Sequence, residues 1–283
     1  MLLIADSGST KADWLISDHN DFKMEFNTLG FNPFFHDEQF VLNELNHNRG
    51  LMHYAKDVKQ LKFYGSGCSH EKRNKVIAGA FKKVFTNADI LVDHDMLGAC
   101  IAACGDDPGV VCILGTGSNA CSYDGKKINA SYHGLGYIIG DEASGSYFGK
   151  KILSSYLYKL LPKPLEEELR DSYHLTKESI IESVYQKSNA NVYLASFAKF
   201  LSSHKESDYV VNLVRKGFTE FYETTITCYP ESKKHPVHFI GSIAYHFNHI
   251  LKEVASKNGF KVGKILVKPA EEILAYFEAK QKS

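Results

Sequence analysis

Short apolar runs alternate with polar turns along the first third of the chain, and their periods predict both strands and helices. Short or alternating apolar runs predict strands, whereas apolar positions three or four residues apart predict helices. The predicted strands cover residues 1–5, 12–17, 22–28, 61–69 and 88–95. The predicted helices cover residues 37–48, 71–84 and 96–104. This mixture predicts an α/β fold.

The remainder of the chain is predicted to be more helical. An Asp-Asp-Pro-Gly turn at 106–109 precedes a strand, a Gly/Thr/Ser turn at 115–118, a second strand and a hairpin turn. A strand at the start of 235–247 breaks at a glycine into a helix, and 264–280 is predicted to be a strand followed by a terminal helix. Helix-period spacing covers residues 142–160, 164–172, 176–187, 190–203 and 206–228.

Two apolar strands end in similar turns, which indicates two similar halves. When Gly8 is superposed on Gly117, Ser9 falls on Ser118 and the flanking apolar runs also align. The chain, with 283 residues, is also long for a single hydrophobic core. We therefore predict two lobes, 1–106 and 107–269.

Composition and charge argue against several classes of partner. The 33 Lys and Arg residues equal the 33 Asp and Glu residues, so there is no electrostatic reason to expect nucleic acid or an anionic membrane. No apolar run approaches the roughly 18 residues that a membrane helix needs. The N-terminus lacks the basic and apolar regions of a signal peptide. We therefore expect a cytoplasmic protein whose six cysteines are reduced thiols.

Three apolar strands end in turns rich in glycine, serine and threonine, at 6–10, 115–118 and 241–242. Glycine allows backbone N–H groups to approach an anion closely, and Ser and Thr hydroxyls add further donors. Two such turns that face each other could bind one triphosphate from both sides. Each turn taken alone could equally be an ordinary tight turn, and the chain contains neither GxxxxGK[ST] nor GxGxxG.

Asp6 distinguishes the first of these turns. A carboxylate among phosphate-binding donors repels the phosphate unless a cation intervenes, and Mg²⁺ held by Asp6 through water would remove this conflict. The alternative is that the Asp6 side chain caps its own turn.

The turns resemble those of a known superfamily, and the resemblance spans nearly the whole chain. Asp6-Ser7-Gly8-Ser9-Thr10-Lys11 resembles the first phosphate loop of the sugar kinase/Hsp70/actin ATPases, and Gly115-Thr116-Gly117-Ser118 resembles the second. The segment 239–244 resembles the adenosine loop. The run Gly134-Leu135-Gly136-Tyr137-Ile138-Ile139-Gly140-Asp141-Glu142-Ala143-Ser144 is more specific, because it resembles the N-acetylglucosamine kinase branch of the BadF/BadG/BcrA/BcrD ATPases.

This resemblance implies a fold and an activity. The fold would be a two-lobed, actin-like ATPase (ribonuclease H-like) α/β fold, with duplicated mixed sheets and a more helical C-terminal lobe. A C-terminal helix, 270–283, would pack back on the N-terminal lobe. The activity would be that of a kinase that uses ATP and Mg²⁺ to phosphorylate an amino sugar, with the 6-OH of N-acetylglucosamine as the expected acceptor. The resemblance also allows a homodimer.

The resemblance implies roles for individual residues as well. Asp95, in Asp95-Met96-Leu97-Gly98-Ala99, matches the general base of these kinases, and Asp93 is the second choice. The positions that match sugar contacts are Asn32, Asp95, Thr116, Gly134, Leu135, Gly136 and Asp141. The positions that match ATP contacts are Asp6, Gly8, Ser9, Thr10, Lys11, Gly115, Thr116, Gly117, Ser118, Gly241 and Ser242.

The chain departs from the family pattern at two positions. Leu135 stands where the mammalian enzymes have a Trp, so the identity of the sugar does not follow from the resemblance. Ala143 stands where glycine is usual, which is a minor change.

Two other functions occur in the same superfamily. Some of its ATPases activate another enzyme through an iron–sulfur cluster held by cysteines in a Cys-Ala-Ala-Gly-Thr-Gly context, whereas Cys100 and Cys104 lie in a predicted small-residue helix. A catalytically silent sugar-binding regulator is the other alternative. The acidic residues Asp6, Asp95 and Asp141 argue against such a regulator.

Overall fold

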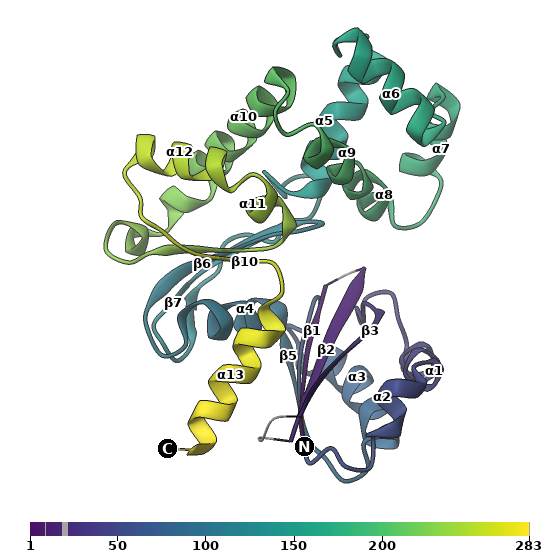
Figure 1. Cartoon of the computed structure of the whole chain (residues 1–283), viewed down its shortest axis with the longest axis vertical. Helices are drawn as coiled ribbons and strands as arrows, with labels where there is room; N and C mark the ends of the chain where they lie inside the picture. Colours follow the sequence, from purple (N-terminus) through teal and green to yellow (C-terminus); the bar gives the residue numbers. More distant parts are fainter. Residues whose placement is uncertain (9, 19–21, 283) are drawn as a thin grey trace. The chain divides into compact units, whose positions relative to one another are not determined.

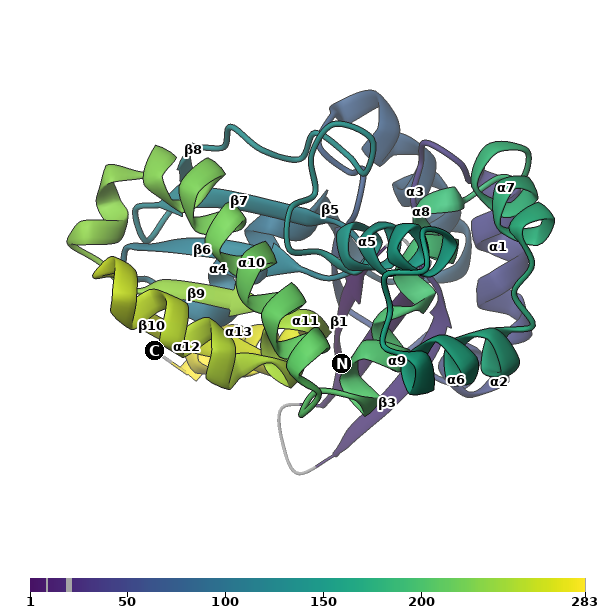
Figure 2. The same cartoon turned by 90° about the horizontal axis from the view of Figure 1, so that it is seen from above.

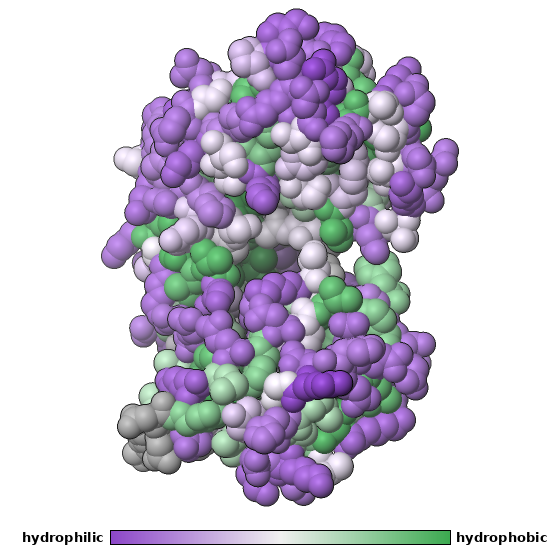
Figure 3. Space-filling view, turned by 45° about the vertical axis from the view of Figure 1, so that its right-hand side comes forward, coloured by the Kyte–Doolittle hydropathy of each residue, from purple (hydrophilic) through white to green (hydrophobic). Residues whose placement is uncertain are grey.

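The computed structural model, which describes residues 1–8, 10–18 and 22–282, divides the chain into two units. Unit 1 comprises residues 1–107, 125–127 and 268–283, and unit 2 comprises residues 108–124 and 128–267. Each unit contains one five-stranded sheet and one hydrophobic core (Figure 1). Hydrophilic residues cover most of the face shown in Figure 3. No helix in the described ranges is long and apolar enough to cross a membrane.

Unit 1 is built on a mixed sheet of order β3-β2-β1-β4-β5. Strands β1, β2 and β3 are antiparallel neighbours, whereas β4 and β5 run parallel to β1. The strands are β1 (Leu2–Ser7), β2 (Lys11–Ser17), β3 (Lys23–Leu29), β4 (Gln60–Gly65) and β5 (Asp89–His94). The helices are α1 (Glu38–His47), α2 (Arg49–His53), α3 (Glu71–Val84), α4 (Asp95–Cys104) and α13 (Pro269–Lys282).

The two faces of this sheet are covered by different helices. Helices α1 and α3 lie on one face, and α4 and α13 pack against each other on the opposite face (Figure 1). Alternation along β2 directs Trp14 into the core of the first face, where Phe31, Phe63 and Phe81 surround its ring at centroid distances of 5.7 to 6.0 Å. Asp13, the preceding residue, therefore points to the face that α4 and α13 cover.

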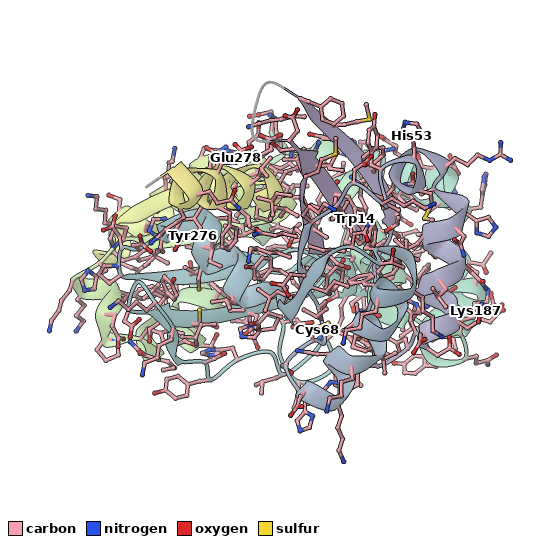
Figure 4. The ribbon with its side chains drawn as sticks, turned by 90° about the horizontal axis from the view of Figure 1, so that it is seen from below. Trp14, His53, Cys68, Lys187, Tyr276 and Glu278 are labelled. Carbon is pink, nitrogen blue, oxygen red and sulfur yellow. The ribbon has the colours of Figure 1, made fainter. Side chains whose placement is uncertain are left out.

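The terminal helix α13 belongs to unit 1, although unit 2 separates it from the rest of unit 1 in the sequence. Glu278 accepts a hydrogen bond from the Ser17 hydroxyl and forms an ion pair with Lys23 at 3.1 Å. The Tyr276 hydroxyl donates to Asp106 at 2.7 Å, and Figure 4 marks both Tyr276 and Glu278 on this helix. These contacts attach α13 to the end of β2, to the start of β3 and to the segment that follows α4.

Unit 2 repeats the strand plan of unit 1. Its sheet has the order β8-β7-β6-β9-β10, with β6, β7 and β8 antiparallel and with β9 and β10 parallel to β6 (Figure 2). Strands β6 to β10 therefore correspond to β1 to β5 in chain order, which confirms the predicted duplication of mixed sheets. The strands are β6 (Gly109–Leu114), β7 (Ser118–Tyr123), β8 (Ile128–Ala130), β9 (Val237–Ile240) and β10 (Val262–Leu266).

Unit 2 is also the more helical unit. Helix α5 packs against α8 and α9, and α12 packs against α10 and β10. The helices are α5 (Gly145–Leu157), α6 (Lys163–Tyr173), α7 (Lys177–Tyr185), α8 (Ala190–Ser196), α9 (Ala198–Ser203), α10 (Asp208–Thr224), α11 (Ser242–His246) and α12 (Asn248–Asn258), with the 3-10 turns η1 (Ile226–Cys228) and η2 (Pro230–Lys233).

The observed helices of unit 2 differ from the predicted ones in three places. The helix predicted over 190–203 is two helices, because the Phe197 N–H bonds to the Leu194 carbonyl three residues back and so interrupts the α-helical pattern. The helix predicted over 206–228 ends at Thr224, after which a 3-10 turn follows. Helix α12 was not predicted at all.

Candidate active site

A row of side chains crosses the sheet of unit 1 near the carboxyl end of β1. Asp6 on β1 pairs with Asp13 on β2 and with Tyr64 on β4, and Tyr64 pairs with Asp93 on β5. Directly paired residues point to the same face, so this row faces α4 and α13. Asp95 is the first residue of α4, directly after β5. Strand pairing therefore gathers acidic side chains that are distant in the sequence.

The carboxyl groups at this edge influence one another. Asp6 is half-buried, and its pKa is raised to about 7, first by burial and then by the negative charges of Asp95 and Asp13. Burial also raises the pKa of Asp95, against the opposing effects of His94 and of the hydrogen bond from the Met96 N–H. Asp6 and Asp95, the two residues of unit 1 that are predicted to bind Mg²⁺ and to act as general base, therefore both hold a proton more tightly than an ordinary Asp.

Asp6→Asn is expected to change how stability depends on pH. Folded Asp6 keeps its proton up to about pH 7, whereas an unfolded Asp loses it near pH 4. Raising the pH from 4 to 7 therefore ionises the unfolded chain first and lowers the free energy of unfolding. Removing this charge should raise the free energy of unfolding at pH 8 by on the order of 2 kcal/mol, with the gain shrinking towards pH 4.

Denaturant titrations of the two proteins at pH 4 and pH 8, without nucleotide or Mg²⁺, measure this difference. A variant that is no more stable than the wild type at pH 8 would contradict the raised pKa of Asp6.

The first glycine turn closes the hairpin between β1 and β2. The Gly8 N–H donates to the Lys11 carbonyl at 3.0 Å, and a Cβ on Gly8 would lie 3.7 Å from that carbonyl oxygen, which is ordinary van der Waals contact. Thr10 is exposed, and Ser9 lies outside the described residues. The Lys11 ammonium lies 2.6 Å from the Asp13 carboxylate, so an acidic partner already balances its charge.

The segment between β3 and α1 contains Asn32, which is buried. Ser7, at the end of β1, accepts a hydrogen bond from the Phe31 N–H at 2.8 Å and so ties this segment to the first hairpin. The Asn32 Oδ1 accepts from the Phe34 N–H at 3.0 Å. A Cβ on Gly67, just after β4, would collide with the Asn32 carboxamide, so glycine there makes room for it. Neither Ser7 nor Gly67 was among the predicted site residues.

The second glycine turn joins β6 to β7 and is bound to the start of α5. The Gly115 carbonyl accepts from the Gly145 N–H at 2.8 Å, and the Thr116 carbonyl accepts from the Ser146 N–H at 3.0 Å. Within the described residues, and apart from its two chain neighbours, no atom lies within 4 Å of the position that a Cβ on Gly115 would take. The turn is therefore held at its carbonyl groups and open beside Gly115.

Asp141 reaches this turn from the segment before α5. Its Oδ1 accepts from the Ser118 N–H at 3.1 Å, and its Oδ2 lies 2.7 Å from the Cβ position of Gly117. Asp141 has a positive φ of 63°, and burial raises its pKa. A residue predicted to contact the sugar thus lies directly on a turn predicted to contact ATP.

The third glycine turn lies beside the second. Gly241 follows β9, which is paired with β6, and it has a φ of 119°. A Cβ on Gly241 would collide with the Leu114 carbonyl and would lie 3.2 Å from the Gly115 nitrogen. Ser242 is the first residue of α11. The predicted adenosine loop and the predicted second phosphate loop are therefore neighbours in unit 2.

The remaining predicted sugar contacts lie in the loop between β8 and α5. Gly134 and Gly136 have positive φ values of 90° and 79°. Leu135 between them is 55% exposed. Lys150 on α5 donates to the Tyr137 carbonyl at 3.3 Å and so attaches this loop to the helix.

Comparisons with known proteins identify the family. No family model matches the chain, and no curated protein matches it. Among solved structures, a candidate N-acetylglucosamine kinase from Porphyromonas gingivalis is 38% identical, with a TM-score of 0.94 over 99% of this chain and 100% of that chain. The chain belongs to the N-acetylglucosamine kinase family.

More distant structures share the fold with this N-acetylglucosamine kinase family member. A candidate N-acetylglucosamine kinase from Chromobacterium violaceum is 18% identical, with a TM-score of 0.73 over 97% of this chain and 98% of that one. An ROK family glucokinase from Streptomyces griseus, solved with glucose and AMPPNP, is 12% identical, with a TM-score of 0.59 over 99% and 98%. Together with the two sheets, these likenesses confirm the predicted fold class.

Proposed function

We propose that this protein is an ATP-dependent kinase that transfers the γ-phosphoryl group to the 6-OH of N-acetylglucosamine. The 38% identity over the whole chain to a candidate N-acetylglucosamine kinase carries the proposal. A glucokinase with the same fold was solved with glucose and an ATP analogue, which supports a sugar and ATP as the two substrates here. The contacts within each unit support separate parts of this chemistry.

Unit 2 offers the phosphate contacts in this proposal. The turn 115–118 lies against the N-terminus of α5, a helix of 13 residues whose dipole favours a nearby anion, and the Gly145 and Ser146 N–H groups of that terminus hold the turn by its carbonyl groups. Its Ser118 N–H is bonded to the Asp141 carboxylate. A phosphate at this turn would therefore replace the Asp141 carboxylate as the acceptor of this N–H. Alternatively, it would lie beside the carboxylate with a cation between the two negative groups.

The acidic edge of unit 1 fits Mg²⁺. Burial raises the pKa of Asp6, the charges of Asp95 and Asp13 raise it further, and a cation would stabilise its ionised form. Mg²⁺ usually keeps several waters and binds through one or two carboxylates and the substrate phosphates. In residues 1–8, 10–18 and 22–282, no three His, Cys, Asp or Glu side chains form a metal cage, which agrees with binding by Asp6 through water. Bound there, the ion would neutralise phosphate charge during transfer.

Asp95 is the general base in this proposal. Its Oδ1 accepts the Met96 N–H at 2.8 Å, and His94 caps the same helix by accepting the Leu97 N–H at 3.2 Å. The carboxylate is thereby held at the first turn of α4. It would orient the sugar hydroxyl and take its proton late, since phosphoryl transfer depends mainly on positioning and charge neutralisation. Asn32 would hold the sugar.

A phosphorylation assay with ATP over a panel of hexoses and N-acetylated sugars tests this function. We expect N-acetylglucosamine to have the highest kcat/KM, with NMR coupling between phosphorus and the C6 protons of the product. ATP hydrolysis without any sugar phosphate, as in an ATPase activator, would overturn the proposal. Sugar binding without turnover, as in a regulator, would overturn it too.

Discrimination for the N-acetyl sugar is expected to be modest. Leu135 is 55% exposed and stands where the mammalian enzymes have a Trp, so one packing surface for the sugar is smaller. Such a loss changes selectivity by about 10- to 200-fold. We therefore expect measurable turnover of N-acetylmannosamine or N-acetylmuramic acid, and a higher preference for N-acetylglucosamine in Leu135→Trp. Strict exclusion of all related sugars by the wild type would show that another residue discriminates.

A further inference from the structure

His133 is a side chain that the proposed mechanism does not use. It lies in the loop between β8 and α5, directly before the segment 134–136 that is predicted to contact the sugar. Its Nδ1 lies 3.0 Å from the Tyr229 hydroxyl oxygen, and its Nε2 lies 3.2 Å from the Thr224 carbonyl oxygen. The imidazole therefore ties this loop to the end of α10 and to the residue between η1 and η2.

The single proton of the Tyr229 hydroxyl is already used. The hydroxyl donates it to the Ala120 carbonyl on β7 at 2.7 Å, in a buried contact where the carbonyl can only accept. Burial raises the pKa of this hydroxyl, so it does not ionise at neutral pH. Its oxygen also accepts the Tyr132 N–H at 3.2 Å. Towards His133 the Tyr229 hydroxyl is therefore an acceptor.

Both ring nitrogens of His133 consequently face acceptors. Nδ1 faces a hydroxyl oxygen whose proton is directed elsewhere, and Nε2 faces a carbonyl oxygen. A neutral imidazole has one N–H and can make only one of these two hydrogen bonds, whereas an imidazolium makes both. The hydrogen-bond network around His133 is therefore complete only when the ring carries two protons.

The surroundings of His133 contain few groups that would hide this effect. The Cys228 thiol donates to the same Thr224 carbonyl at 3.3 Å, and the Glu220 carboxylate on α10 accepts from the Tyr147 hydroxyl. Among the described residues, no carboxylate forms an ion pair with His133. Imidazole is the side chain that ordinarily changes its charge between pH 5 and pH 8. The titratable side chains on the surrounding elements are the thiols and carboxyl groups of Cys112, Cys121, Cys228, Glu220 and Glu223.

The segment 134–136 depends on its two ends for a fixed shape. Gly134 and Gly136 both have positive φ values, and glycine leaves the backbone free to adopt other conformations. At the far end, Lys150 donates to the Tyr137 carbonyl at 3.3 Å. At the near end, the ring of His133 makes the two contacts described above. A hydrogen bond lost at His133 therefore loosens one of the two ends.

We propose that His133 positions the segment 134–136 for the acceptor sugar, and that it does so fully only as an imidazolium. The inference rests on the proposed function, because this segment contacts the sugar only in that proposal. A looser segment must be ordered when the sugar binds, which lowers the affinity. Since the ordered segment holds the second proton, sugar binding takes up protons, and the Kd for the sugar rises as the pH rises.

Calorimetry of N-acetylglucosamine binding, without nucleotide or Mg²⁺, tests this role. The ratio of the Kd at pH 8 to the Kd at pH 5 should be about 3- to 10-fold larger in the wild type than in His133→Gln. Gln keeps a hydrogen-bonding side chain but does not titrate. Titrations in buffers of different ionisation enthalpy should show more protons taken up by the wild type than by the variant. Asp95 is present in both proteins, so its own titration cancels in this comparison.

Tyr229→Phe tests the same network with the histidine in place. Phe removes the oxygen that faces Nδ1, so a neutral His133 can make its remaining bond to Thr224 without a second proton. The Ala120 carbonyl keeps a hydrogen bond from the Ser131 hydroxyl at 3.3 Å. We therefore expect this variant to fold and to have the same weak pH dependence of the Kd as His133→Gln.

His204→Gln is the matched control. His204 also faces acceptors with both ring nitrogens, which lie 2.8 Å from the Phe200 carbonyl and 3.0 Å from the Glu168 carboxylate. It connects the end of α9 to α6, away from the loop between β8 and α5 in the sequence. Its loss should leave the wild-type pH dependence of sugar binding intact. A Kd raised equally at every pH in His133→Gln would overturn the inference, because the ring would then only fill space.

The same samples separate this inference from the proposed function. If N-acetylglucosamine is phosphorylated but its Kd has the same pH dependence in the wild type, His133→Gln and Tyr229→Phe, the inference fails and the kinase assignment stands. If the sugar binds with proton uptake that depends on His133 but no sugar phosphate forms, the inference stands and the kinase assignment fails. Absence of sugar binding by the wild type at every pH would overturn both.

Discussion

Asp95→Asn is expected to lower kcat by about 10²- to 10⁴-fold, while the affinity for ATP stays near the wild-type value. A sugar hydroxyl is a poor nucleophile at neutral pH, and a carboxylate bound to it directs its lone pair to phosphorus and then accepts the proton. Asn has nearly the same shape as Asp and still forms hydrogen bonds, but it cannot accept that proton. Steady-state kinetics with N-acetylglucosamine, together with AMPPNP binding by calorimetry, measure the two effects separately.

Asp93→Asn is the matched control, because Asp93 lies two residues earlier on β5. Its Oδ1 accepts the N–H of His94 at 2.8 Å, and its side chain is 31% exposed. The charge of Asp95 contributes to the raised pKa of Asp6, which places Asp95 near the carboxylate proposed to bind Mg²⁺. We therefore expect Asp93→Asn to keep most of kcat. An inactive Asp93→Asn beside an active Asp95→Asn would reassign the base to Asp93.

Gly115→Val is expected to weaken AMPPNP binding by about 100-fold or more, with little change in the melting temperature. The free energy of several charge-assisted hydrogen bonds to phosphate is lost if the anion cannot approach the turn. Apart from its two chain neighbours, no atom of the described residues lies within 4 Å of the new Cβ, so the Cβ enters open space beside the turn. Isothermal calorimetry and a thermal melt of the same samples measure both quantities.

Gly117→Val is a less specific test of the same turn, although the sequence alone suggests it. A Cβ on Gly117 would lie 2.7 Å from the Asp141 carboxylate, so the substitution also displaces a predicted sugar contact. Loss of function in this variant would not distinguish ATP from sugar. Wild-type AMPPNP affinity in Gly115→Val, by contrast, would show that the turn at 115–118 does not bind phosphate.

The sequence predicts strands more completely than helices in this protein, for a physical reason. Glycine turns interrupt the apolar runs at Gly8, Gly115 and Gly241, so the ends of three strands are visible in the sequence. Strand β8 was missed because three residues are too short to show alternation. The apolar residues Ile250, Leu251 and Val254 have helical spacing in α12.

The candidate site is predictable only where its chemistry is local in the sequence. Asp6 and Asp95 stand beside strand ends that the sequence reveals. Asp13 joins them through the register of β1 with β2, and Gly67 joins Asn32 through the placement of β4. Register depends on which face of each strand is buried and on contacts between distant segments, which no short motif records.

The place of α13 in unit 1 has a consequence for synthesis of the protein on the ribosome. The face of the first sheet that carries Ile4 and Leu15 is covered by α4 and by α13, and α13 is translated only after unit 2. At 5–20 residues per second, roughly 10–30 s pass between completion of residue 107 and arrival of residue 268. During that interval α4 alone covers this face, and the apolar part that α13 will cover stays exposed. A stop codon just before Pro269 would leave this apolar surface permanently exposed, so the loss of a segment after unit 2 would destabilise unit 1.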